Sequence, residues 1–191
     1  MKTRKLRKDK INNRYQDIYL KSYIKEMGNN SKAVIKTDHH KGLSYINGKP
    51  WRVIFPPSLI NFILDIPKTK VKEYCFIGNL TKDREWVKDF ASSDSIIRST
   101  NQTKYNRARY DRRYYKDICK SKFTLCPVGN CPWSYRFFEA IMCFSIPIME
   151  KNSTDRFYKD YFYYTVGEDH VYSFKDALNN FRIFLNTNGP H

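Results

Sequence analysis

Residues 121–148 constrain the fold more than any other part of this chain, because 28 residues hold a strand, a loop, a helix and a second strand. The apolar runs Phe123–Cys126 and Ile146–Met149 predict buried strands, and a helix is expected over 134–144 between them. A small loop between a buried strand and a helix start is where α/β proteins hold the phosphates of nucleotides. The segment therefore predicts an α/β fold with an anion site at this loop.

Short apolar strands and helices alternate from residue 73 onward. We expect strands over 74–77, 95–98, 162–166 and 170–174, and helices over 83–90, 105–121 and 176–185. This alternation predicts a doubly wound, mostly parallel sheet with helices on both faces. Before it, we expect a helix over 12–27, a hairpin over 43–55 that turns at Asn47-Gly48, and a helix over 59–64. The expected domains are a small N-terminal extension, 1–72, and an α/β domain, 73–191.

The charge of the chain is +16 and uneven. Residues 1–26 hold nine Lys and Arg against three acids, and residues 104–122 hold eight against two. The N-terminal run is typical of a solvated tail, with contact to acidic lipid or nucleic acid as an alternative. Neither a secretory signal nor a spanning segment is visible, so we expect a cytoplasmic protein, with peripheral membrane contact through the basic N-terminus left open. The cysteines are odd in number and sit in apolar patterns, which favours buried free thiols and no metal site: Cys75, Cys119, Cys126, Cys131 and Cys143.

The loop and the helix that follows it carry the side chains expected of an anion site. Ser134 is a good N-cap, and Gly129 lets the backbone approach a ligand closely. Arg136, in the first turn, can fork onto phosphate oxygens, and Glu139, one turn later, can accept ribose hydroxyls. Taken alone, Arg136 and Glu139 could instead be an ordinary surface pair at i,i+3 spacing.

These residues form a pattern that resembles exostosin-like glycosyltransferases. The pattern consists of Ser121-Lys-Phe123, Leu125-Cys-Pro127, Gly129, Ser134, Arg136, Phe138-Glu-Ala140 and Ile146-Pro-Ile148. The strand Tyr74–Gly78, with Arg84 after it, resembles the first strand of the nucleotide-binding half of that family. The resemblance covers about residues 73–150 and implies the C-terminal half of a GT-B glycosyltransferase, Rossmann-like in fold.

The resemblance implies transfer of a sugar from a nucleotide diphosphate donor to a hydroxyl of a glycan or glycoprotein. It assigns the diphosphate to Arg136 and the ribose or sugar hydroxyls to Glu139. Gly129 and Asn130 would line the pocket, with Ser134, Gly78 and Arg84 around it, and neither metal nor cofactor is expected. In place of the family's Gly before Ile-Pro stands Ser145, which predicts a looser turn. Only about 72 residues precede the matching half, so the acceptor domain is reduced or supplied by a partner chain, or the chain is inactive.

Candidates for a general base are few. Asp38, His39 and His40 are the obvious ones in the N-terminal part, although Asp-His-His also reads as an exposed loop. Two other functions stay open: a nucleotide-sugar-binding module without transferase activity, and a basic nucleic-acid-binding protein. The latter would use the cationic helix face formed by Arg109, Arg113, Lys116 and Lys120.

Overall fold

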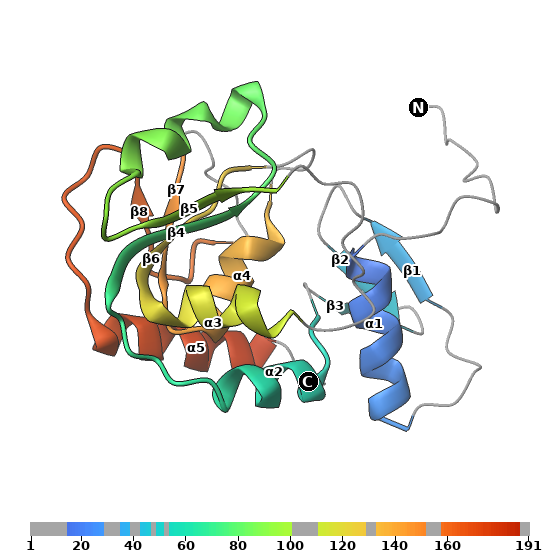
Figure 1. Cartoon of the computed structure of the whole chain (residues 1–191). Helices are drawn as coiled ribbons and strands as arrows, with labels where there is room; N and C mark the ends of the chain where they lie inside the picture. The colour runs from blue at the N-terminus through green and yellow to red at the C-terminus, as the bar shows by residue number, and fades with distance from the viewer. Residues whose placement is uncertain are drawn as a thin grey trace.

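A computed structural model of the chain describes residues 15–28, 35–38, 43–46, 49–51, 54–100, 111–128, 133–151 and 158–187. Five of its strands form one sheet in the order β5-β4-β6-β7-β8, and every neighbouring pair is parallel. These strands are β4 (Lys72–Gly78), β5 (Ile96–Ser99), β6 (Ser121–Leu125), β7 (Ile146–Met149) and β8 (Tyr164–Thr165). The predicted doubly wound parallel sheet is confirmed (Figure 1).

Helices cover both faces of this sheet. One face carries α2 (Pro57–Leu64), α3 (Arg112–Lys120), α4 (Tyr135–Met142) and α5 (Phe174–Thr187), and the other carries the 3-10 helix η2 (Lys82–Phe90) (Figure 1). Successive side chains along each strand point to opposite faces of the sheet. Cys75 and Ile77 join the larger core under the α-helices, whereas Phe76 packs with Val87 of η2 on the opposite face.

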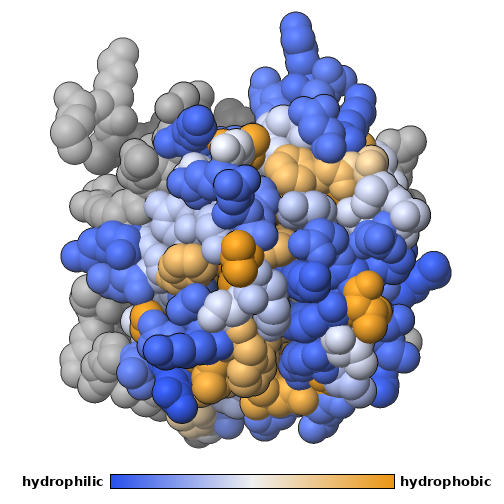
Figure 2. Space-filling view, turned by 90° about the vertical axis from the view of Figure 1, so that its left-hand side faces the viewer, coloured by the Kyte–Doolittle hydropathy of each residue, from blue (hydrophilic) through white to orange (hydrophobic). Residues whose placement is uncertain are grey.

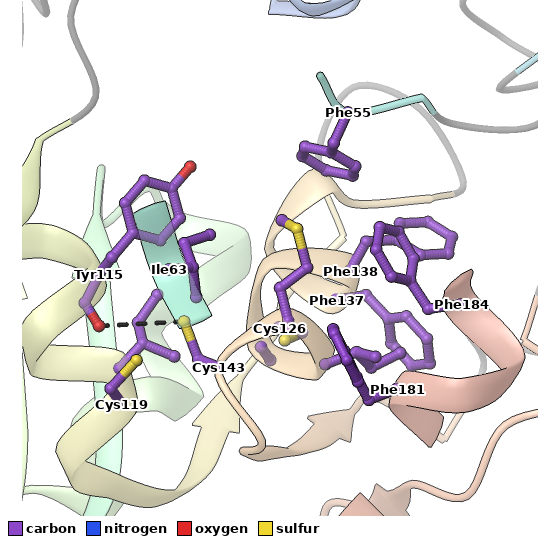
Figure 3. Packing of buried hydrophobic residues seen from close by; sticks show 14 of the residues in the cluster. Phe55, Ile63, Tyr115, Cys119, Cys126, Phe137, Phe138, Cys143, Phe181 and Phe184 are labelled. Carbon is purple, nitrogen blue, oxygen red and sulfur yellow. Dashed lines mark hydrogen bonds between the residues drawn. The ribbon is translucent and has the colours of Figure 1, made fainter. Parts of the chain in front are cut away.

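The larger core is rich in aromatic rings and thiols. Phe137 and Phe138 of α4 pack against Phe181 and Phe184 of α5, as Figure 3 shows. Tyr19 and Phe55, from the N-terminal part of the chain, belong to the same cluster. The described cysteines are free and buried, and they are Cys75, Cys119, Cys126 and Cys143.

The N-terminal part contains α1 (Tyr15–Glu26) and a separate antiparallel sheet in the order β1-β2-β3, formed by Ile35–Asp38, Leu43–Ile46 and Lys49–Trp51. The predicted hairpin is confirmed, with Ile46 opposite Lys49. Helix α1 contacts α2, and Ser58 donates its backbone N–H to the Glu26 carboxylate at 2.8 Å. In Figure 1 this part lies beside the end of the large sheet at which β4 and β5 finish. No helix among the described residues is long and apolar enough to span a bilayer.

The C-terminus of α4 explains how the chain turns without the glycine expected before Ile-Pro. Ser145 donates its N–H to the Ala140 carbonyl and Phe144 to that of Ile141, which is the Schellman arrangement. Phe144 takes the left-handed conformation (φ 56°) that glycine usually occupies at this position. Its ring packs 4.8 Å from that of Phe181 and stacks on Phe174, so apolar contacts offset the backbone strain.

Two predictions of local structure need correction. Residues 82–90 form the predicted helix, which is a 3-10 helix, but Ser121 opens β6 instead of ending α3. No strand forms over 170–174. Instead, His170 is held among aromatic rings, its Nδ1 lying 3.2 Å from the Tyr74 hydroxyl, and Phe174 opens α5. The apolar pattern there serves packing against the sheet, not strand pairing. Residues 105–110 of the predicted basic helix lie outside the described part.

Candidate functional site

The candidate site lies where the strand order of the sheet reverses. The chain runs from β4 outward to β5 and then returns to β6 on the other side of β4. Ligands of open α/β sheets bind beyond the carboxyl ends of the strands at such a switch point. Here the β4 end is Gly78, and β6 leads through Cys126 to the start of α4. The backbone therefore brings Gly78 and the first turn of α4 to one place.

Arg136 lies across this switch point. Its Nη2 donates to the Ile77 carbonyl at 3.0 Å, and its Cζ lies 4.7 Å from the centroid of the Phe76 ring. Its Nε is buried and has no partner among the described residues. Burial alone would lower the pKa of Arg136, but neighbouring groups, among them Tyr114 and Glu139, raise it overall. Arg136 is thus a fixed cation with an unused donor.

Gly78 is required by this position of Arg136. A Cβ on Gly78 would collide with Nη2 of Arg136 and would lie 3.2 Å from Cζ of Phe76. No other residue type leaves this space open. The structure therefore brings together Gly78 and Arg136, two of the predicted site residues that are far apart in sequence, through one steric requirement.

Arg84 supplies a second guanidinium nearby. Its Nε donates to the Val128 carbonyl at 3.3 Å and its Nη1 to the Asn79 carbonyl at 3.1 Å. Burial lowers the pKa of Arg84, and the charge of Arg136 lowers it further. Two guanidinium groups that repel each other at the end of a sheet favour a bound anion between or beside them.

Glu150 and Trp86 also belong to this end of the sheet, and the sequence analysis did not identify them. Glu150 directly follows β7, and its carboxylate accepts from Trp86 Nε1 at 2.8 Å and from the Val128 N–H at 3.3 Å. It thereby holds the start of the loop after β6 in place. Its position one residue beyond a buried strand was the signal in the sequence that could have singled it out.

Ser134 caps α4 as predicted. Its hydroxyl accepts from the Arg136 N–H at 3.2 Å, and its own N–H donates to the Tyr158 hydroxyl at 2.8 Å. The cap fixes the first turn of α4, and therefore the direction from which Arg136 reaches β4.

Glu139 lies deeper, with only 6% of its surface exposed, so the alternative of an ordinary surface pair with Arg136 does not describe it. Its carboxylate accepts from three tyrosines, Tyr114 at 2.6 Å, Tyr115 at 3.2 Å and Tyr19 at 3.4 Å. Burial raises the pKa of Glu139, and these hydrogen bonds, together with Arg136, oppose that shift.

The remaining predicted site residues are less informative. Asp38 ends β1, opposite Leu43, whereas His39, His40, Gly129 and Asn130 lie outside the described residues. On α3, Arg113 and Lys116 are exposed, Lys120 is half-buried, and Arg109 lies outside the described part. No group of three or more His, Cys, Asp or Glu in the described ranges is placed to hold a metal ion.

Comparisons with known proteins show what part of this chain is similar to a known family. Residues 84–160 match the family model of the Exostosin GT47 domain. Two rice proteins (Oryza sativa subsp. japonica), each named "Probable glucuronosyltransferase", are 34% identical to this chain over 65 residues. The match covers 34% of this chain but only 12% and 11% of those proteins. The chain thus corresponds to a small part of these relatives.

The matched residues include Arg84, Arg136, Glu139 and Glu150, which are the charged groups of the site. The match begins within η2 and runs through β5, α3, β6, α4 and β7, whereas β4, on the other side of the switch point, lies outside it. Residues 84–160 are thus similar to the Exostosin GT47 domain, and in this chain they contribute strands and helices to a Rossmann-like parallel sheet.

Proposed function

We propose that this chain binds the diphosphate of a nucleotide-sugar at the β4–β6 switch point and serves transfer of the sugar to a hydroxyl of a glycan or glycoprotein. The observation that carries the proposal is the position of Arg136, fixed over Gly78 with a buried Nε that has no partner among the described residues. A phosphate oxygen is the natural acceptor for such a donor. Arg84 adds a second positive charge, as departure of a diphosphate requires.

The role of each residue follows from its place. Arg136 and the capped start of α4 would hold the diphosphate, and Arg84 would neutralise its outer charge. Glu139 would accept a hydroxyl of the ribose or sugar. No metal is assigned in this proposal, because the guanidinium groups supply the positive charge. In this proposal, a partner chain or a further segment supplies the general base and the acceptor site. A cytoplasmic location stays a prediction.

A thermal-shift measurement tests the binding step. Uridine or guanosine diphosphate at 100 times its Kd should add about 2.7 kcal/mol to the free energy of unfolding, which is a rise in Tm of roughly 5–10 °C for a chain of this size. Arg136→Ala should abolish the shift, and Arg113→Ala, at an exposed position on α3, should leave it unchanged. Equal shifts in both variants would contradict the proposed site.

A nucleotide-sugar-binding module without transferase activity is the second candidate, and one observation favours it. The carboxylates of buried Glu139 and half-buried Glu150 already accept hydrogen bonds, Glu139 from tyrosines and Glu150 from Trp86, so neither is an unengaged general base. Release of nucleoside diphosphate from a nucleotide-sugar by the purified chain supports the transferase, and binding without release supports the module. Oligonucleotide binding that weakens steeply with salt and with Arg113→Ala would instead support the nucleic-acid alternative.

A further inference from the structure

Three tyrosine hydroxyls converge on Glu139 from two helices distant in sequence. Tyr114 and Tyr115 come from α3, and Tyr19 comes from α1 in the N-terminal part of the chain. The Tyr19 and Tyr115 hydroxyl oxygens lie 3.3 Å apart, and because each hydroxyl has one proton, both donate to Glu139 only when neither donates to the other. Figure 3 shows Tyr115 beside Ile63 and Cys143. A buried carboxylate that receives three O–H donors is fixed in its orientation as well as in its charge.

The three bonds are not equivalent. The Tyr114 bond, at 2.6 Å, has the length of a charge-assisted O–H···O⁻ bond, whereas the bonds from Tyr115 and Tyr19 are 3.2 and 3.4 Å long. Tyr114 alone occupies Oε2, and the other two share Oε1. A carboxylate offers about four acceptor positions. The network therefore fills three and leaves one, on Oε2.

The surroundings make these donors necessary. Burial raises the pKa of Glu139 and so favours its neutral form, which is a weaker hydrogen-bond acceptor than the carboxylate and carries a proton on one oxygen. Arg136 is the opposing charge on α4. The other titratable neighbours are Cys126, which follows β6, and Cys143, at the end of α4, and burial raises the pKa of both thiols. Burial and the charge of Glu139 also raise the pKa of Tyr114 well above its usual range, so its hydroxyl keeps the proton that it donates.

We propose that Tyr114 is a positioning residue for the nucleotide-sugar site: it holds Glu139 ionised and oriented, with a single acceptor position left for one hydroxyl of the ligand. Tyr115 and Tyr19 support the same carboxylate, and Tyr19 thereby makes helix α1 part of this site. The identity of the ligand rests on the proposed function, whereas the effect of Tyr114 on Glu139 is a property of the free protein.

Tyr114→Phe tests the proposal, because it removes the hydroxyl and keeps the ring. In the free protein, the Glu139 carboxyl carbon can be followed by ¹³C NMR through a pH titration, with Glu139→Gln to assign its signal. Loss of a hydrogen bond to a charged group should raise the Glu139 pKa by roughly 1 to 2. Tyr172→Phe is the matched control, since its hydroxyl donates to the Phe144 carbonyl at 3.0 Å and does not bond Glu139. An unchanged Glu139 titration in Tyr114→Phe, whatever its Tm, would overturn the proposal.

Nucleotide binding gives a second readout. With uridine diphosphate, the pH midpoint of binding should rise in Tyr114→Phe by the same amount as the Glu139 pKa, and Tyr115→Phe should show a smaller rise because its bond is longer. With one acceptor position, only one of the 2′-deoxy and 3′-deoxy analogues should lose affinity, by roughly tenfold. A loss of affinity with both analogues would contradict a single open acceptor position on Glu139. If the wild type binds no nucleotide, the proposed function fails, and the NMR titration still decides the role of Tyr114.

Discussion

Replacement of Gly78 by alanine is the sharpest test of the geometry at the switch point. The new Cβ would collide with Nη2 of Arg136 and would lie 3.4 Å from its Cζ and 3.2 Å from Cζ of Phe76. The backbone of Gly78 does not need glycine, because its φ lies outside the left-handed region. The cost of Gly78→Ala is therefore expected to come from the displaced guanidinium.

The magnitude follows from the contacts that Arg136 would lose. A hydrogen bond from a charged group, such as that from Nη2 to the Ile77 carbonyl, contributes about 1.5–3 kcal/mol. The cation–π contact with Phe76 contributes about 0.5–2 kcal/mol. Alanine restores roughly 0.4–1 kcal/mol by restricting the unfolded chain. Gly78→Ala should thus lower the free energy of unfolding by about 1–4.6 kcal/mol.

A double-mutant cycle of Gly78→Ala and Arg136→Ala, measured by urea denaturation, tests whether the loss of stability comes from the displaced guanidinium. In an Arg136→Ala background, the Cβ has room and Gly78→Ala should be neutral or stabilising by up to about 1 kcal/mol. The coupling between the two changes should therefore be at least about 2 kcal/mol. An equal loss in both backgrounds would refute the reasoning, since the cost would then lie in the backbone or in Phe76.

Three further predictions concern other parts of the fold. Lys70 donates to the Ser121 and Cys143 carbonyls, and burial lowers its pKa from 10.5 to about 8, so the unfolded chain binds more protons between these values. The free energy of unfolding of the wild type, measured relative to that of Lys70→Met by urea denaturation, should therefore rise by about 2–3 kcal/mol from pH 7.5 to pH 10. The same difference at both pH values would contradict the burial of Lys70. Asp111→Ala removes the side chain that caps α3 through the Arg113 and Tyr114 N–H groups, and should cost about 1 kcal/mol in urea denaturation, whereas an unchanged midpoint would exclude the cap. Burial raises the pKa of Cys75 to about 12, so in a Cys131→Ser background thiol reagents at pH 8 should react only as fast as the chain unfolds, and rapid labelling of any of the four buried thiols would contradict the core.

The parallel sheet was predictable because its signals are local. Each strand is a short apolar run, and Ser134, followed by an apolar helix, marks the start of α4 without tertiary information. The position of Arg136 in the first turn was likewise visible, because the helix start sets its direction. These features depend on residues close in sequence, so the pattern of residue types is enough to find them.

The contacts that complete the site were not predictable from the sequence. Gly78 and Arg136 meet only because β4 and β6 are neighbours in the sheet, and Tyr19 reaches Glu139 across 120 positions. His170 was predicted to lie in a strand, because the apolar pattern around it does not reveal that its ring packs against other aromatic rings, such as that of Phe123. In each case the deciding contact is between distant elements, whose pairing local patterns do not specify.

A crystal structure with bound uridine or guanosine diphosphate tests the central claim most directly. The account predicts a phosphate oxygen within hydrogen-bond distance of Nε of Arg136, above Gly78, with the Tyr114–Glu139 bond retained. A nucleotide bound on the exposed face of α3, with Arg136 Nε still unpartnered, would contradict it.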